Sequence, residues 1–409
     1  MRIGYMVPEF PGQTHIMFWR EVRALRDMGE RVFLVSTRYP SSSCPHDFCS
    51  DAISETHYIY PPTLGCLVSW TASGGKGLAS CLSYLRSLEA RQLGERMKQG
   101  ALLMSAIELT CWAHEHRINH IHGHSCADAA HVLALARRLG GPAYSMTLHG
   151  DLAVYGRDHR AKMKDAAFVC AVGRHLRRQL EDQIGIPAHK IIETFMGIET
   201  SEARKSGTAR LSAQGKLHLV TVARLNAAKG HEYVLMAINQ GVKMGLDLRY
   251  TIVGDGPHLA ALVNQTRELC IEEHVIFAGS LAESAVYKML SSADVFILAS
   301  TGLGEAWPVS VMEAMSAGLP VICSTIGATS EMITCGEDGF LVPQADAGAL
   351  IMKIALLAQN VELRKRLGEA AQATARQRFD VGLSAGALRD AVRASRASEN
   401  RCRFEMFNK

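Results

Sequence analysis

The sequence lacks the features that mark several classes of protein. In its 409 residues no run of 18 apolar residues occurs, so we expect no segment that spans a membrane. The 11 cysteines are odd in number, irregularly spaced and without a Cys-x-x-Cys pair, which argues against a disulfide scaffold and for reduced thiols. No secretory signal peptide is recognised, because residues 2–7 follow Met1 directly and are typical of a first strand. We therefore expect a cytoplasmic protein.

Charge of one sign and aromatic residues are also scarce. Lys and Arg number 44, Asp and Glu number 40, and the net charge of +4 is too weak for a dedicated nucleic-acid binder. Such a charge is compatible with an anionic ligand or an anionic membrane surface. Hydrophobic residues make up 48% and aromatic residues 6%, so we expect folded domains with mainly aliphatic cores. Histidine is unevenly placed, since 13 of 17 lie in the first 200 residues.

The length is typical of two domains. Both halves alternate short apolar segments with amphipathic ones, the pattern of α/β proteins with parallel sheets. Strands are predicted at residues 2–7, 31–35, 120–122, 143–148, 167–171, 217–222, 249–253, 275–277, 295–298 and 320–323. The polar segment at residues 202–209 predicts a linker. We expect a first domain at residues 1–204, a second at residues 205–378, and a helical tail at residues 379–409 that packs back on the first domain.

Two glutamates flank the start of a predicted helix at residues 308–317. Glu305 lies in the loop after the strand at residues 295–298, and Glu313 lies within the helix that Pro308 opens. The start of a helix offers free N–H groups and a positive dipole, which suit phosphate or sugar hydroxyls. Carboxylates at the carboxyl edge of a parallel sheet lie where such folds bind ligands. One surface glutamate and one that favours the helix dipole would give the same pattern.

Two cations follow the first strand of the second half. Arg224 lies at the end of the strand at residues 217–222, and Lys229 opens the next helix. A forked guanidinium and a compact ammonium in one loop suit a diphosphate. Taken alone, the loop is better described as ordinary exposed basic residues.

In this order, the segments at residues 222–230, 252–257 and 305–342 resemble the retaining glycosyltransferases of family 4, which have the GT-B fold. The resemblance covers nearly the whole second half. The first half matches only in short segments, among them Pro11-Gly12 and residues 147–151. The resemblance implies an α/β fold of two Rossmann-like parallel-sheet domains that face a central cleft. The first domain would serve the acceptor and the second the nucleotide sugar.

The resemblance also implies roles for the matching residues. Arg224 and Lys229 would hold the diphosphate of the donor, and Glu313 would bind its ribose hydroxyls. Glu305, with the N–H groups of Ala306 and Trp307, would hold the transferred sugar. Val309, at the start of the helix, would add a further contact to the donor.

Two residues of the first half are implied in the same way. His149, at the end of a predicted strand, would face the sugar. Gly12 would let the first loop approach the phosphates closely, since it has no side chain. The catalytic set implied is therefore His149, Glu305, Arg224 and Lys229.

The mechanism expected from these residues needs no metal and no cofactor other than the nucleotide sugar. No Asp-x-Asp occurs, which argues against a metal-bridged diphosphate. Arg224, Lys229 and helix dipoles would offset the charge of the leaving group instead. Retention normally suggests a carboxylate nucleophile, but the family pattern places none, so we expect front-face attack.

The function implied is transfer of a hexose, with UDP as the expected nucleotide, to a glycan or lipid-linked acceptor in surface polysaccharide or glycolipid biosynthesis. Other GT-B activities, such as an epimerase, and a catalytically silent nucleotide-sugar-binding subunit are the alternatives. We expect no nucleic-acid partner. Residues 61–106 are apolar and rich in turns, and we interpret them as helices packed on the first domain. The alternative is a docking surface for a membrane or lipid-linked acceptor, with the protein at the inner face of the membrane.

Three alternating histidines remain. His120, His122 and His124 share one face of a predicted strand, and Cys126 lies nearby. Zinc binding is one interpretation. A strand edge that lines a cleft would show the same alternation, and we favour it.

Overall fold

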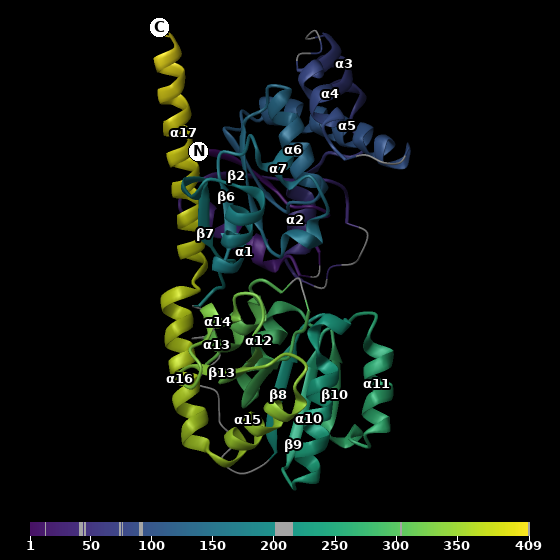
Figure 1. Ribbon diagram of the computed structural model, residues 1–409, viewed down its shortest axis with the longest axis vertical. Coiled ribbons are helices and arrows are strands. Elements are labelled where there is room, and N and C mark those ends of the chain that lie inside the picture. The colour runs from purple at the N-terminus through teal and green to yellow at the C-terminus, as the bar shows by residue number, and fades with distance from the viewer. Residues whose placement is uncertain are drawn as a thin grey trace. The chain divides into compact units, whose positions relative to one another are not determined.

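The computed structural model describes residues 1–407 apart from residues 13, 41–43, 45, 73–74, 76, 90–92, 201–215 and 303–304. The chain forms two compact units (Figure 1). The first comprises Met1–Cys44, Phe48–Phe195 and Ser384–Lys409, and the second comprises Pro45–Asp47 and Met196–Leu383. The predicted linker at residues 202–209 and the predicted boundary after residue 204 lie outside the described residues.

The first unit is built on a seven-stranded sheet in the order β3-β2-β1-β4-β5-β6-β7, in which every pairing is parallel. The strands are β1 (Arg2–Met6), β2 (Arg31–Ser36), β3 (Thr56–Tyr58), β4 (His120–His124), β5 (Ala143–Leu148), β6 (Val169–Val172) and β7 (Ile191–Thr194). All residues of β4 and β5 are buried, as expected for central strands of a parallel sheet that is covered on both faces.

The second unit is built on a six-stranded parallel sheet in the order β10-β9-β8-β11-β12-β13. The strands are β8 (Leu217–Val222), β9 (Leu248–Val253), β10 (Val275–Gly279), β11 (Val295–Leu298), β12 (Val321–Ser324) and β13 (Gly339–Val342). Side chains of successive residues in β11 point to opposite faces of the sheet, because side chains alternate along a strand. Val295 and Ile297 join one hydrophobic cluster, and Phe296 and Leu298 join another.

Helices connect the strands in both units (Figure 1). In the first unit they are α1 (Ile16–Asp27), α2 (Cys49–Glu55), α3 (Leu64–Ala72), α4 (Leu78–Arg86), α5 (Leu93–Glu115), α6 (Asp128–Arg138), α7 (His159–Met163) and α8 (Arg174–Arg178). In the second they are α10 (His231–Lys243), α11 (Leu259–Glu268), α12 (Glu283–Ser292), α13 (Val309–Ser316), α14 (Thr329–Met332), α15 (Ala347–Gln359) and α16 (Val361–Arg378). Helix α17 (Val381–Phe407) begins in the second unit, and its residues from Ser384 on belong to the first.

The segment at residues 61–106 forms α3, α4 and the first part of α5. Helix α3 exposes two apolar side chains four residues apart, Leu64 at 81% and Val68 at 67%. Tyr84 of α4, in contrast, is buried against His131 of α6. Among the described residues, no helix combines the length and the apolar character needed to cross a membrane.

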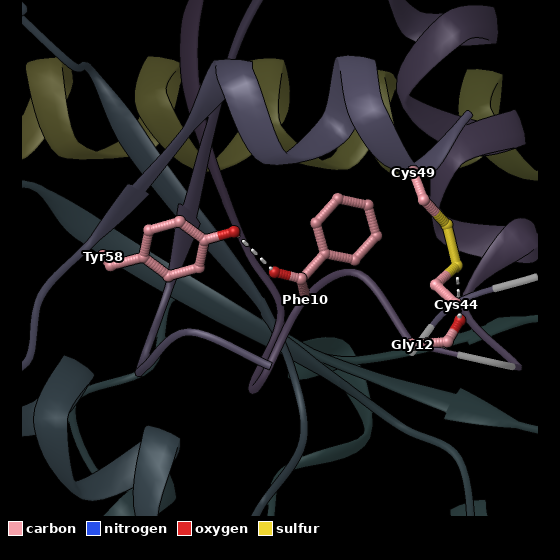
Figure 2. The surroundings of a disulfide bond; sticks show 5 residues. All are labelled: Phe10, Gly12, Cys44, Cys49 and Tyr58. Atoms are coloured by element: carbon pink, nitrogen blue, oxygen red, sulfur yellow. Dashed lines mark hydrogen bonds between the residues drawn. A yellow bond between two sulfur atoms is a disulfide. The ribbon is translucent and has the colours of Figure 1, made fainter. Parts of the chain in front are cut away.

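One prediction about cysteine is wrong. Cys44 and Cys49 form a disulfide (Figure 2), although we expected reduced thiols throughout. The bond lies beside the loop that follows β1, and Cys44 Sγ is 3.8 Å from the carbonyl oxygen of Gly12. The same loop is held by Tyr58, whose hydroxyl donates to the carbonyl oxygen of Phe10 at 3.0 Å. The two cysteines are five residues apart, and the argument from the odd number and irregular spacing of the cysteines did not allow for a single local disulfide.

Candidate functional site

Both sheets have the strand order of a doubly wound fold. Numbered from the first strand of each unit, six strands follow the order 3-2-1-4-5-6, and strands 1 and 4 are neighbours. Connections leave these two strands in opposite directions, so a crevice opens at their carboxyl ends, where such folds bind ligands. In the second unit these strands are β8 and β11. Arg224 and Lys229 follow the first, and Glu305 follows the second.

An ion pair joins the two loops at this point. Lys229 Nζ contacts Glu305 Oε2, and Ser300 Oγ donates to the same carboxylate oxygen at 3.0 Å. The side chains of Lys229 and Glu305 are 20% and 13% exposed, so both remain accessible from solvent. Ser300 was not among the predicted site residues. The only signal for it in the sequence is its position two residues after β11.

Backbone contacts fix the loop that carries Lys229. Gly230 has φ of 63°, and a Cβ at this position would lie 1.9 Å from the carbonyl oxygen of Ala299. Thr301 also donates its N–H to the carbonyl oxygen of Ala228 at 2.8 Å. Only glycine permits this approach. The ammonium of Lys229 is therefore held beside Glu305 by the backbone and not by the ion pair alone.

The loop that carries Glu305 is fixed from its other side. A Cβ on Gly327 would lie 1.9 Å from the carbonyl oxygen of Glu305. Ala328 donates its N–H to the carbonyl oxygen of Ala306 at 2.9 Å. The connection after β12 thus supports the segment that leads into α13.

Arg224 differs from Lys229 in having no side-chain partner. It is exposed, and among the described residues no hydrogen bond or ion pair holds its guanidinium. Its backbone is constrained, because the neighbouring Leu225 donates its N–H to the carbonyl oxygen of Asp255 at 2.9 Å. A fixed backbone with an unpaired, forked cation is suited to an anionic ligand such as a diphosphate.

The other predicted residues of this unit lie at the start of α13. Ala306 is buried, Val309 is the first helical residue, and Glu313 is 8% exposed one turn later. The first N–H groups of a helix lack acceptors within it, so this end can receive oxygen atoms of a ligand. The indole of Trp307 donates to Met312 Sδ at 3.1 Å and packs edge-on against Phe379.

The remaining predicted residues, Gly12 and His149, belong to the first unit and follow β1 and β5. Gly12 accepts a hydrogen bond from the N–H of His15, and a Cβ on Gly12 would lie 3.1 Å from the His15 ring. His149 is half-buried, and its backbone N–H donates to the hydroxyl of Tyr155 at 2.9 Å.

The alternating histidines of β4 are buried and hydrogen-bonded. His120 Nε2 and His122 Nδ1 both contact Ser145 Oγ, at 2.7 and 2.8 Å. His122 Nε2 contacts Thr147 Oγ1 at 2.8 Å. The interpretation of these histidines as lining a cleft is wrong for His120 and His122, which are 0% exposed.

The zinc interpretation also gains no support. In the described part of the chain, no group of three His, Cys, Asp or Glu residues has the geometry of a metal site. The hydroxyl groups of Ser145 and Thr147 on the neighbouring strand form hydrogen bonds with the two ring nitrogens of His122 instead. Hydroxyl partners explain how so many imidazoles can be buried, since buried polar groups need hydrogen bonds.

Burial keeps these imidazoles neutral. It lowers the pKa of His120, His124 and His149 to about 3 each, because a low-dielectric surrounding disfavours the charged ring. Neighbouring cations add to the effect at His120, and neighbouring histidines add to it at His124 and His149. The candidate site in the first unit therefore offers neutral hydrogen-bonding groups, whereas that in the second offers charges.

Comparison with known proteins identifies the second unit. Residues 205–374 match the family described as Glycosyl transferases group 1. The amylovoran biosynthesis glycosyltransferase AmsK of Erwinia amylovora is 33% identical over 180 residues, which are 43% of this chain and 44% of AmsK. The GDP-mannose-dependent alpha-(1-6)-phosphatidylinositol monomannoside mannosyltransferase of Mycolicibacterium smegmatis is 26% identical over 253 residues, 58% of this chain and 66% of that protein. The chain thus spans less than half the length of the first curated relatives it matches.

The fold extends over both units. The crystal structure of Anabaena HepE in complex with UDP has a TM-score of 0.73 to this chain, covering 96% of this chain and 100% of HepE at 18% identity. The predicted α/β fold class of two Rossmann-like parallel-sheet domains is confirmed. The second unit of this chain thus matches the family described as Glycosyl transferases group 1, and the two sheets together have the GT-B fold.

Proposed function

We propose that this protein is a retaining glycosyltransferase that moves a hexose from a nucleotide sugar to a glycan or lipid-linked acceptor in surface polysaccharide or glycolipid biosynthesis. The observation that carries the proposal is the Lys229–Glu305 ion pair, in a loop that also carries the exposed Arg224, at the carboxyl edge of a unit that matches the group 1 glycosyltransferases. Relatives named for amylovoran biosynthesis and for mannosyl transfer to a phosphatidylinositol mannoside support both acceptor classes.

Each charged residue of the donor site has a role in this proposal. Arg224 and Lys229 bind the diphosphate, and Val309 at the start of α13 adds a further contact to the donor. The N–H groups of Ala306 and Trp307, just before α13, bind the transferred sugar. Glu313 accepts hydrogen bonds from the ribose hydroxyls. Glu305, oriented by Ser300 and Lys229, accepts hydrogen bonds from the hydroxyls of the sugar. UDP is the proposed nucleotide, as in the HepE complex, and the mannosyltransferase relative makes GDP the alternative.

The proposed reaction requires no metal ion. The bond between the anomeric carbon and the phosphate oxygen breaks, and the bond to the acceptor oxygen forms on the same face of the sugar. The acceptor proton passes to the departing phosphate oxygen, so no protein base is needed. Arg224 and Lys229 stabilise the negative charge that develops on the diphosphate, which fixed cations do effectively because they need no reorganisation. From the first unit, His149 contacts the sugar and Gly12 leaves room for the phosphates.

A panel of nucleotide sugars tests the donor. A ligand that binds only the folded state raises the melting temperature, so UDP and GDP sugars are compared by thermal shift. Product analysis by NMR then reports the anomeric configuration. We expect a retained anomer and no epimerised donor. An epimerised donor would support the epimerase alternative, and binding without hydrolysis or transfer would support a silent subunit. A trapped glycosyl-enzyme adduct would contradict front-face attack.

Peripheral contact with a membrane is part of this proposal. Leu64 and Val68 lie four residues apart on one face of α3, and Tyr60 just before the helix is 48% exposed. Apolar side chains on an amphipathic surface helix can enter the headgroup region of a bilayer. We expect the protein to float with anionic liposomes and the double variant Leu64→Ser with Val68→Ser to float less. Equal flotation of both proteins would remove α3 from the proposal.

A further inference from the structure

A chain of buried polar side chains leads from the core of the first sheet to His149. It begins at Tyr5 of β1, whose hydroxyl donates to Glu21 Oε2 at 2.6 Å. Both residues are buried, Tyr5 at 0% and Glu21 at 4% exposure. A carboxyl group so deep in a core is costly unless it is hydrogen-bonded, and Tyr5 meets part of that need. We name Tyr5, Glu21, His124 and His149 the Glu21 chain.

The second step is from Glu21 to His124. His124 Nε2 lies 3.4 Å from Glu21 Oε2. This nitrogen is buried and makes no hydrogen bond of good geometry. The carboxylate oxygen at 3.4 Å therefore determines whether the nitrogen carries a proton or a lone pair. A lone pair directed at that oxygen would be repelled, whereas an N–H would be attracted. The hydroxyl of Tyr5 donates to the same oxygen at 2.6 Å, a length typical of a hydroxyl that donates to an ionised carboxylate. The contact between an ionised Glu21 and His124 therefore favours a proton on His124 Nε2.

The third step is from His124 to His149. His124 Nδ1 lies 3.1 Å from His149 Nε2, so one nitrogen donates and the other accepts. A neutral imidazole carries one proton. If that proton is on His124 Nε2, then His124 Nδ1 is the acceptor and His149 Nε2 must donate. The proton of His149 is thereby placed on Nε2, and its Nδ1 keeps a lone pair.

Packing restricts both rings to this arrangement. The rings of His124 and His149 stack with centroids 5.3 Å apart and planes 21° from parallel. Phe18 contacts both rings, at 4.8 and 5.4 Å between centroids. Rings packed in this way do not turn freely, so their hydrogen-bonding pattern is set before any ligand arrives.

We propose that Glu21 is a positioning residue: through His124 it holds His149 in the tautomer protonated at Nε2, so that His149 Nδ1 accepts a hydrogen bond from a hydroxyl group of the bound sugar. The proposal deepens the proposed function, because it rests on a sugar bound against His149. The proposal predicts that a donor sugar without this hydroxyl binds more weakly. It also predicts that His149 need not carry a positive charge for the sugar to bind.

The ring nitrogens of His149 can be tested without any substrate. Nitrogen-15 NMR of histidine-labelled protein distinguishes protonated from unprotonated ring nitrogens, and His149→Asn assigns the signals. We expect a protonated Nε2 in the unmodified protein and a gain of the Nδ1-protonated form in Glu21→Gln. Glu108→Gln is the matched control, since it changes a buried carboxylate that pairs with His57 and does not belong to the Glu21 chain, and its His149 signals should not move. A protonated Nδ1 in the unmodified protein, or unchanged signals in Glu21→Gln, would overturn the proposal.

Kinetics give a second readout that a merely structural role would not produce. Glu21→Gln should lower kcat/KM for transfer about tenfold, the effect of one lost hydrogen bond to the substrate. In the His149→Asn background the same substitution should have no further effect, because Glu21 acts only through His149. Additive losses would contradict the proposal. Glu108→Gln, which changes another buried carboxylate paired with a histidine, His57 at 3.1 Å, should leave transfer unchanged.

The NMR and kinetic results separate two kinds of failure. If no nucleotide sugar is turned over, the proposed function fails, while the tautomer of His149 is still decided by NMR. If Glu21→Gln does not fold, His124→Phe breaks the Glu21 chain at its middle and keeps a ring in the stack. That variant should shift His149 in the same direction, and an unshifted His149 would overturn the proposal.

Discussion

The two sheets of this protein share a strand order but differ in what lies at the same topological position. In the first unit β4 carries three buried histidines, whereas the corresponding strand of the second unit, β11, is entirely apolar. The imidazoles of His124 and His149 around the end of β4 are neutral and hydrogen-bonded to each other. The side chains of Lys229 and Glu305 around the end of β11 are charged and accessible. The same topology thus provides two chemically distinct sheet edges, and the accessible ion pair at this position lies in the unit that matches the glycosyltransferase family.

The largest effect is expected from removing the charge of Lys229. Lys229→Ala should lower kcat for transfer by about 10²–10³, because it deletes a cation that stabilises the leaving diphosphate and leaves Glu305 without its partner. A steady-state transfer assay measures the loss. Lys216→Ala is the control, since Lys216 of the same unit makes an exposed ion pair with Asp247. Similar kcat values for the two variants would mean that the second unit does not supply the charge that transfer needs.

The next largest effect is expected from a substitution at Gly230, where the backbone of the second unit passes close to the carbonyl oxygen of Ala299. Gly230→Ala should lower the free energy of unfolding by about 3 kcal/mol, because it combines left-handed strain with a clash against the carbonyl oxygen of Ala299. Gly245→Ala has the same left-handed backbone and open space, so about 1 kcal/mol is expected. Urea titrations measure both. Equal losses would show that the loop of Lys229 is not held by this approach.

The neutral histidines predict that acid destabilises the first unit more than the second. His120, His124 and His149 have a pKa of about 3 when folded, against about 6.5 when unfolded. Protons therefore bind the unfolded chain preferentially between these values. The stability contributed is complete above about pH 6.5 and is lost as the pH falls towards 3, by at most about 1.4 kcal/mol per pH unit for each ring.

Fluorescence can assign that loss to a unit. Of the four tryptophans only Trp307 lies in the second unit, so Trp307→Phe leaves a signal from the first unit alone. Its urea midpoint should fall clearly between pH 7.5 and pH 5. In the second unit His231 has a pKa of about 4, so we expect the stability of that unit to depend on pH less steeply. A midpoint of the first unit that does not change with pH would contradict the neutrality of its core histidines.

The smallest effect concerns Arg224. Arg224→Ala should weaken the binding of UDP about tenfold, the usual size for one charge-assisted hydrogen bond to phosphate in a wet site. Isothermal titration calorimetry measures the affinity. Arg249→Ala, which removes another exposed arginine from near the start of β9, should bind UDP as the unmodified protein does. If the two variants bind equally well, Arg224 does not contact the diphosphate.

Much of the fold could be predicted from the sequence because parallel strands are buried on both faces and therefore form short apolar runs. The strands at residues 143–148, 217–222 and 295–298 were predicted to the residue, and β9 to within one residue. The short edge strands β3 and β7 were missed, since residues such as His57 and Glu193 interrupt their apolar character. An edge strand is covered on one side only and needs no apolar run.

The residues of the candidate site were predicted from motifs, but the contacts that hold these residues in place were not. The sequence places Lys229 and Glu305 in two loops 76 residues apart, and only the structure joins them through Ser300 and the close approach at Gly230. In the same way, Glu21 and His124 gave no sign of lying beside His149. Such contacts depend on strand order, which a local pattern does not contain.

The depressed pKa of His149 has a consequence for how the protein responds to its surroundings. Histidine is usually the side chain through which a protein senses small changes in acidity. Here the ring keeps the same single proton from about pH 4 upward, so it behaves like a fixed amide dipole and not like a titrating group. Under the proposed function, the hydrogen bond from His149 to the sugar would therefore stay the same while the pH varies above about 4.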